Sequence, residues 1–166
     1  MDVAILAGGL GTRLHRLWNG PKCLVPVGGR PLINRLLEEV ARLKPRRLVL
    51  LLGHRADEIC AHLGYRLNVP IIIEDPPRGT ASVIRNALNS TTIELGAPLL
   101  VLNGDTLPRY DLGALVRYYE QRPGAWATAA FTHDATAWRD VYAGACVLSA
   151  AALKEIAADE RTRDFH

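Results

Sequence analysis

Four short segments of the chain are apolar at almost every position, and this pattern constrains the fold more than any other feature. They occupy about 3–6, 47–52, 69–73 and 98–102. Strands that are apolar throughout are expected where helices cover both faces of a parallel sheet. The pattern therefore predicts an α/β fold: a three-layer α/β/α sandwich with a Rossmann-like, mostly parallel sheet of about six to seven strands.

Helical spacing fills the intervals between these segments. Across 31–43 the apolar residues recur every three or four positions, which gives one buried face and predicts a helix. We expect further helices over about 55–63, 81–88, 112–121 and 150–158, and Asp111 should cap the helix over 112–121. Two more strands are expected over 126–131 and 141–148. A chain of this length, residues 1–166, is expected to form a single domain.

Bulk properties exclude several classes of function. The net charge of +3 comes from scattered residues with no basic stripe among aromatics, so we expect no nucleic-acid partner. No apolar run approaches the roughly 20 residues that span a bilayer, so no membrane association is expected. Cys23, Cys60 and Cys146 are odd in number and widely spaced, and the start does not resemble a signal peptide. These features predict a soluble cytoplasmic protein with free thiols.

A glycine-rich turn, Gly8-Gly9-Leu10-Gly11, follows the first apolar segment. Glycine lets bare backbone N–H groups approach a polyphosphate. The turn has neither the Gly-Lys-Ser/Thr ending of a nucleoside-triphosphatase loop nor the spacing of a dinucleotide binder, which favours a mononucleotide. The same glycines could instead serve backbone geometry alone. The predicted nucleotide-binding residues here are Leu6, Ala7, Gly8, Gly9, Gly11 and Thr12.

Two cations flank this turn. Arg13 follows it directly, and Lys22 comes after Pro21, which stiffens the chain ahead of the ammonium group. A nucleoside triphosphate carries about four negative charges, so bringing it against a second phosphate requires cations and a metal. Either residue alone could be a solvated surface cation. Together with the turn they predict nucleotidyl transfer, with Arg13 and Lys22 as catalytic residues.

Two further polar turns are expected in the same cleft, because ligands collect beyond the carboxyl ends of such strands. Asp105 ends the fourth apolar segment and is predicted to be catalytic and to hold Mg²⁺, which takes one or two carboxylates; its alternative role is to cap the next turn. Glu74, Gly79 and Thr80 lie in a proline-stiffened turn where a base edge could be read. Loop stiffening alone would also explain the prolines.

Several of these segments together resemble one enzyme family. Three segments are similar to the amino-terminal signature of the sugar-1-phosphate nucleotidyltransferases, the NDP-sugar pyrophosphorylases. They are Leu6-Ala7-Gly8-Gly9-Leu10-Gly11-Thr12-Arg13-Leu14, Pro21-Lys22-Cys23-Leu24-Val25-Pro26-Val27 and Pro31-Leu32-Ile33. Arg78-Gly79-Thr80-Ala81 resembles their base-reading loop, and Leu102-Asn103-Gly104-Asp105 their metal-binding strand end. The form of the base-reading loop is closer to guanylyl- and adenylyl-transferring members, and we expect a likeness to mannose- and heptose-1-phosphate guanylyltransferases.

The resemblance implies Mg²⁺-dependent transfer of a nucleoside monophosphate from an NTP, with a preference for GTP, to a sugar 1-phosphate, with release of pyrophosphate (an EC 2.7.7 type of reaction). It implies that the turn from Gly8 to Thr12 holds the triphosphate, Arg13 stabilises the leaving pyrophosphate, Lys22 neutralises the reacting phosphates and Asp105 holds Mg²⁺. Attack is in line, without a covalent enzyme intermediate. The nucleotide-binding part would cover about 1–120, and the resemblance leaves a homo-oligomer open.

The similarity thins in the acceptor part, about 121–166, which is shortened. Family members carry an adjacent Glu-Lys pair that grips the sugar phosphate, whereas this chain has only Lys154-Glu155, in the last expected helix. Two alternatives therefore remain. One is a non-catalytic nucleotide-binding regulatory or structural subunit. The other is a nucleotidyltransferase for another small phosphorylated acceptor, such as a molybdopterin.

Overall fold

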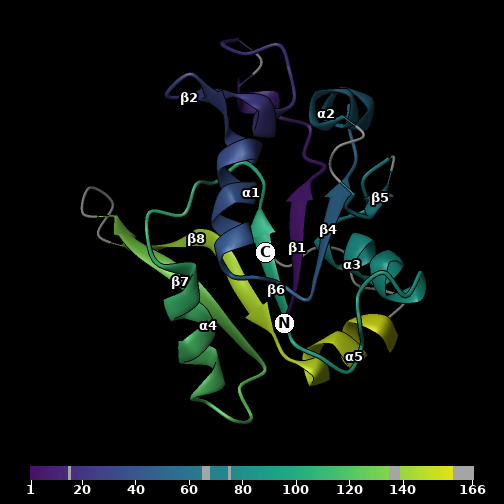
Figure 1. Cartoon of the computed structure of the whole chain (residues 1–166), viewed down its shortest axis with the longest axis vertical. Helices are drawn as coiled ribbons and strands as arrows, with labels where there is room; N and C mark the ends of the chain where they lie inside the picture. Colours follow the sequence, from purple (N-terminus) through teal and green to yellow (C-terminus); the bar gives the residue numbers. More distant parts are fainter. Residues whose placement is uncertain (15, 65–67, 75, 135–138, 159–166) are drawn as a thin grey trace.

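The computed structural model describes residues 1–14, 16–64, 68–74, 76–134 and 139–158, without the side chain of Arg13. Its centre is a six-stranded sheet in the order β5-β4-β1-β6-β8-β7 (Figure 1). The strands are β1 (Asp2–Ala7), β4 (Arg47–Leu52), β5 (Ile71–Ile73), β6 (Leu99–Asn103), β7 (Ala127–Asp134) and β8 (Arg139–Leu148). The helices are α1 (Leu32–Arg42), α2 (Ala56–Leu63), α3 (Thr80–Asn89), α4 (Leu112–Glu120) and α5 (Ala150–Ala158).

Strand direction follows the expected mostly parallel pattern. β1 pairs in parallel with both β4 and β6, and β5 extends the parallel set beyond β4. Only β8 runs antiparallel, between β6 and β7. The prediction of an α/β fold with a mostly parallel sheet is therefore confirmed.

Alternate residues of the strands face two separate cores. In β1, Val3 and Ile5 pack with α1, α2 and α4, whereas Ala4 packs with α3 and α5. All three residues are essentially inaccessible to solvent. Because helices cover both faces of the sheet, the interior strands β1, β4 and β6 are apolar at consecutive positions, which is the pattern seen in the sequence.

The ends of several elements differ from the sequence-based expectation. β5 begins at Ile71 rather than at residue 69, and Pro70 lies just before it. The Pro70 carbonyl accepts a bond from the Leu50 amide, but proline has no N–H to continue the ladder. The hairpin of β7 and β8 is longer than expected. Two short strands that the sequence did not indicate, β2 (Pro26–Val27) and β3 (Arg30–Pro31), form a separate hairpin.

The cap at α4 is confirmed. The Asp111 side chain accepts a hydrogen bond from the Gly113 backbone N–H at 2.7 Å, and the helix ends just before Gln121. The three cysteines are free thiols, as expected. Among the residues that the structure describes, no helix is both long and apolar enough to cross a membrane.

Candidate functional site

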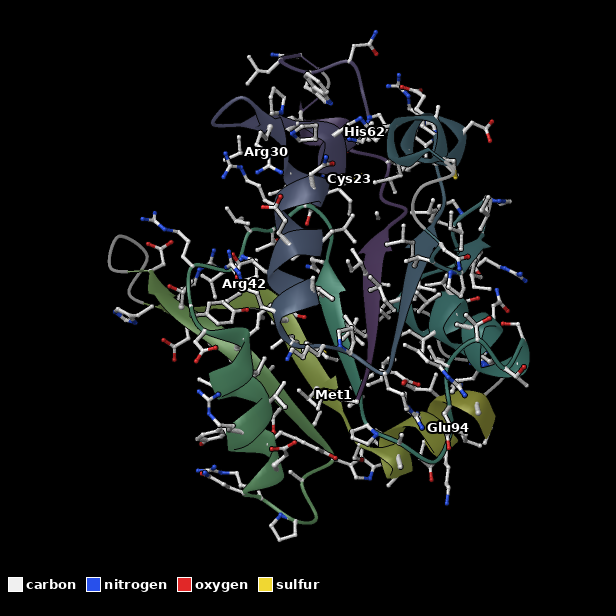
Figure 2. The ribbon with its side chains drawn as sticks, in the orientation of Figure 1. Met1, Cys23, Arg30, Arg42, His62 and Glu94 are labelled. Atoms are coloured by element: carbon white, nitrogen blue, oxygen red, sulfur yellow. The ribbon has the colours of Figure 1, made fainter. Side chains whose placement is uncertain are left out.

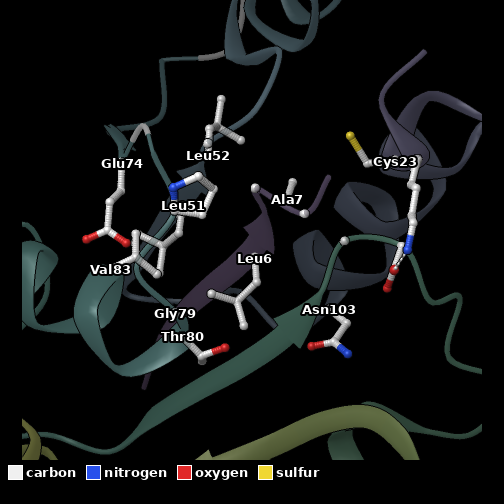
Figure 3. Close-up of a pocket in the computed structure, with 17 residues that line it drawn as sticks. Leu6, Ala7, Cys23, Leu51, Leu52, Glu74, Gly79, Thr80, Val83 and Asn103 are labelled. Carbon is white, nitrogen blue, oxygen red and sulfur yellow. Dashed lines mark hydrogen bonds and ion pairs between the residues drawn. The ribbon is translucent and has the colours of Figure 1, made fainter. Parts of the chain in front are cut away.

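A pocket opens at the carboxyl ends of β1, β4 and β6, where the polar turns were expected to meet (Figure 3). Its volume is about 280 Å³, close to the lower end of the roughly 300–1,000 Å³ typical of small-molecule sites. The pocket therefore suits part of a mononucleotide. Its lining includes most of the predicted site residues, namely Leu6, Ala7, Gly8, Gly9, Lys22, Glu74, Gly79, Thr80 and Asp105.

Two predicted residues, Gly11 and Thr12, are not among those that line the pocket, and Thr12 begins a short 3-10 helix, η1 (Thr12–Leu14). The Arg13 side chain lies outside the described part of the structure. Their phosphate-binding roles stay predictions.

Sequence reasoning missed several residues of the pocket wall. The position of Gly53, directly after the second apolar segment, could have indicated a place at the carboxyl end of a strand. The apolar lining residues gave no such indication, because their pattern is that of core residues. The lining residues that were not predicted as site residues are Cys23, Leu51, Leu52, Gly53, Pro77, Val83, Asn103 and Gly104.

The ends of β1 and β4 pack backbone against backbone. A Cβ atom at Gly8 would lie 3.0 Å from the Gly53 nitrogen, and one at Gly53 would lie 3.0 Å from the carbonyl oxygens of Gly8 and Glu74. The Gly8 carbonyl also accepts a bond from the His54 amide at 3.3 Å. Glycine at both positions therefore lets the main chain form this wall of the pocket.

Lys22 and Asp105 meet in the pocket. The Lys22 Nζ atom lies 3.4 Å from the Asp105 Oδ2 atom, and the two side chains are 26% and 43% exposed, so both remain open to a ligand. Thr106 Oγ1 donates to Asp105 Oδ1 at 3.3 Å. A cation and a carboxylate brought together beside bare glycines can serve phosphate and metal chemistry in one site.

The loop before Lys22 is held by side chains outside the pocket. The Trp18 Nε1–H donates to the Pro21 carbonyl at 3.0 Å, and that carbonyl also accepts from the Leu24 amide at 2.9 Å. The Arg55 Nη2 donates to the Asn19 carbonyl at 3.2 Å. Trp18 is not among the pocket residues, so its observed contact is with this loop. Lys22 then begins the 3-10 helix η2 (Lys22–Leu24).

Cys23, which follows Lys22 in the chain, also lines the pocket. Burial raises the pKa of the Cys23 thiol from its ordinary value of 9.0 to about 12, and the negative charge of Asp105 adds to the increase. A thiol with this pKa is neutral near pH 7. It therefore lines the pocket without supplying a thiolate nucleophile.

The Glu74 carboxylate, on the opposite side of the pocket, is buried and accepts bonds from protein donors. Its Oε1 accepts from Ser82 Oγ at 2.6 Å and from Asn86 Nδ2 at 2.8 Å. Its Oε2 accepts from the Arg78 backbone N–H at 2.9 Å. Gly79, the N-cap of α3, has a φ of 109°, a conformation that favours glycine. Glu74 thus connects the predicted base-reading loop to α3.

Asp105 is a single carboxylate and not part of a protein metal cage. Within the described residues, no group of three or more His, Cys, Asp or Glu side chains could hold a metal. Mg²⁺ is commonly held by one or two carboxylates, with phosphate oxygens and water as its other ligands. The half-exposed Asp105 side chain, which lines the pocket, fits that mode.

Among the described residues of the part from about 121 onward, no basic pair lines the pocket. Lys154 and Glu155 lie in α5, and neither lines the pocket. β8 ends at Leu148, just before α5, and Leu148 pairs with Leu99, the first residue of β6. The helix therefore begins at the end of the sheet opposite the pocket.

Comparisons with known proteins agree with this geometry. The family model of MobA-like NTP transferase domains matches residues 3–166. The bifunctional protein GlmU of Synechococcus sp. (strain RCC307) is 35% identical over 105 residues, which are 63% of this chain and 23% of that protein. The chain thus spans about a quarter of the length of the curated relatives it matches.

Solved structures share the whole fold. The crystal structure of HddC from Yersinia pseudotuberculosis in complex with GMP-PN is 28% identical and superposes with a TM-score of 0.74, over 99% of this chain and 81% of HddC. The inositol-1-phosphate CTP transferase of T. maritima, at 14% identity and a TM-score of 0.72, covers 99% of this chain and shares the fold. These matches confirm the predicted relation to nucleotidyltransferases, and the chain belongs to the family of MobA-like NTP transferase domains.

Proposed function

We propose that this chain transfers a nucleoside monophosphate from a nucleoside triphosphate to a sugar 1-phosphate and releases pyrophosphate. One observation carries the proposal: the Lys22–Asp105 ion pair lies in the same pocket as the bare backbone of Gly8 and Gly9. These groups come from three distant segments of the sequence. Membership of a nucleotidyltransferase family and the likeness to HddC and GlmU support it.

The donor nucleotide would extend across the pocket. Its phosphates would lie along Gly8 and Gly9, with the neighbouring turn of Gly11, Thr12 and Arg13 taking the leaving pyrophosphate. Its base would lie against Gly79 and Thr80 at the start of α3. The form of this loop, together with the GMP-PN complex of HddC, favours GTP as the donor.

Asp105 would hold Mg²⁺ in this site. A bound magnesium ion supplies positive charge to the reacting phosphates. Lys22 adds a second positive charge where negative charge concentrates during attack. Because Lys22 pairs with Asp105 in the structure, ligand binding would replace one attraction by two: Lys22 with phosphate and Asp105 with the metal.

The reaction needs no covalent enzyme intermediate. An oxygen of the acceptor phosphate attacks the α-phosphorus of the donor, and the bond from that phosphorus to the bridging oxygen breaks, so pyrophosphate leaves with the electron pair. The attacking oxygen is already an oxyanion, so no general base is required. Cys23, with its raised pKa, is consistent with direct transfer.

The identity of the acceptor rests on the family resemblance. The nucleotide-binding part, about 1–120, contains every described residue of the pocket, and the part from about 121 to 166 would bind the acceptor. A reducing cytoplasmic setting suits the three free thiols.

The test is a panel assay. Purified protein with Mg²⁺, the four ribonucleoside triphosphates, thymidine triphosphate and a set of sugar 1-phosphates should release pyrophosphate, fastest with GTP, and a chelator should stop it. No release with any pair would contradict the proposal. Calorimetry then separates the non-catalytic alternative, which would bind a triphosphate tightly but no sugar phosphate, even with pyrophosphate present. Release only with a different phosphorylated acceptor would favour the other alternative.

A further inference from the structure

Glu74 is a buried carboxylate whose oxygens point to protein groups. Its side chain is 5% exposed, while its ion-pair partner Arg78, with Nε 3.6 Å from Oε1, is 71% exposed. A carboxylate buried this far is costly unless hydrogen bonds replace its hydration. Ser82, Asn86 and the Arg78 backbone supply those bonds.

The donors come from two different parts of the chain. Ser82 and Asn86 are four residues apart on α3 and share a face of the helix. The Arg78 amide belongs to the loop that precedes the helix. One side chain therefore fixes the loop to the first two turns of α3, with Gly79 and Thr80 held between the two attachment points. Figure 3 shows Glu74, Gly79 and Thr80 on the same side of the pocket.

We propose that Glu74 is a positioning residue that sets the base preference of the site by holding the Arg78-to-Thr80 backbone, and that it does not itself contact the base. This inference rests on the proposed function, since it takes the base to lie against that loop. Base discrimination depends on a few backbone hydrogen bonds whose geometry tolerates little displacement. The phosphate-binding groups, Gly8 and Lys22, belong to other elements and would keep their positions.

Two substitutions separate hydrogen bonding from charge. Glu74→Ala leaves the three donors without an acceptor. In Glu74→Gln the amide oxygen can accept from the Arg78 N–H, while the amide NH₂ donates to Ser82 Oγ and to the oxygen of a rotated Asn86 amide. The glutamine variant thus restores the connections without the charge.

Asp2 provides a matched control. It is also a buried carboxylate, bound by Arg46 Nε at 3.0 Å and by the Glu94 amide at 3.1 Å. Met1 and Glu94, which are next to Asp2 in the chain and in the structure, lie at the end of the molecule opposite Cys23, which lines the pocket (Figure 2). Asp2→Ala therefore removes a buried, hydrogen-bonded carboxylate without touching the pocket.

The experiment measures binding of GTP, ATP, CTP, UTP and thymidine triphosphate by calorimetry to the wild type and to these variants. We expect Glu74→Ala to reduce the ratio between preferred and other bases about tenfold. The Gln and Asp2→Ala variants should keep that ratio. If Glu74→Ala does not fold, Ser82→Ala and Asn86→Ala take its place, each with a smaller loss of the same kind.

Three outcomes would overturn the inference: a wild type that does not discriminate between bases, a Glu74→Ala variant that weakens all nucleotides equally, or a glutamine variant as defective as alanine. A wild type that discriminates between bases but transfers nothing would defeat the proposed function, while the binding ratios would still test Glu74. The two failures are therefore distinguishable.

Discussion

Lys22 and Asp105 lie 83 positions apart in the chain, yet their Nζ and Oδ2 atoms come within 3.4 Å of each other in the pocket. Pro21 and η2 present the lysine, and the end of β6 presents the aspartate. Both side chains keep access to solvent, so the pair contributes less than about 1 kcal/mol to folding. Its importance is that it brings a cation and the proposed metal ligand together in one place.

Lys22→Ala and Asp105→Asn should each lower turnover by about 10²- to 10³-fold, because the first removes a positive charge from beside the reacting phosphates and the second weakens the proposed metal ligand. Melting temperature should change little, because both side chains are partly exposed. Glu38→Gln, an exposed carboxylate that pairs with Arg30, serves as the control and should keep full activity. Normal turnover in either pocket variant would remove that residue from the mechanism.

Gly8→Ala and Gly9→Ala form a matched pair. A methyl group at Gly8 would press on the Gly53 backbone at 3.0 Å, so we expect a loss of about 1–3 kcal/mol in unfolding free energy together with weaker nucleotide binding. A methyl group at Gly9 meets nothing within 4 Å, so only nucleotide binding should weaken. Denaturant titrations and calorimetry measure the two effects. Equal stability of the two variants would contradict the tight packing at Gly8.

Cys23 should react slowly with iodoacetamide at neutral pH, and its rate should rise until about pH 12. A chain carrying Cys60→Ser and Cys146→Ser isolates this thiol. The same pKa shift makes the free energy of unfolding depend on pH. Below pH 9 the Cys23 thiol is neutral in both the folded and the unfolded chain, and its contribution to stability is fully present. Between pH 9 and about 12 the thiol ionises more readily in the unfolded chain, so that contribution is lost. Rapid alkylation of the folded chain at pH 7 would show that the thiol is not buried as described.

Trp18→Phe tests how Lys22 is positioned. The variant keeps an aromatic ring against Gly20 but loses the donor to the Pro21 carbonyl, so Lys22 should be held less firmly. We expect kcat to fall about fivefold, for about 1 kcal/mol of lost positioning, with little change in the nucleotide Kd. An unchanged kcat would indicate that proline and η2 alone fix the lysine.

Much of the fold could be predicted because its signals are local. The strands of the sheet interior are apolar at consecutive positions, and α1 repeats its apolar residues at helical intervals. The hairpin of β2 and β3 was not predicted, because a two-residue strand is too short to show the alternation of apolar and polar residues that identifies a strand. The start of β5 was misplaced because Val69 looks like strand, whereas Pro70 interrupts the ladder.

The site was predictable only in part. The rule that ligands gather at strand ends predicts that the turns of Gly8, Gly79 and Asp105 share one cleft, and all three residues line the pocket. The partners of Glu74 could not be predicted, because Ser82 and Asn86 look like ordinary polar residues of a helix. Their contact with a carboxylate exists only once β5 and α3 pack together. A local pattern identifies a polar group near a site but not the direction in which it points.

The most direct test of the central claim follows the α-phosphate of the donor. GTP radiolabelled at the α-phosphate, incubated with Mg²⁺ and the acceptor found in the panel, should place its label in a sugar nucleotide in a one-to-one ratio with pyrophosphate, and Asp105→Asn should slow the formation of both by about 10²- to 10³-fold. Label that stays in GTP, or that appears only in free nucleotide without an acceptor product, would contradict nucleotidyl transfer at this pocket.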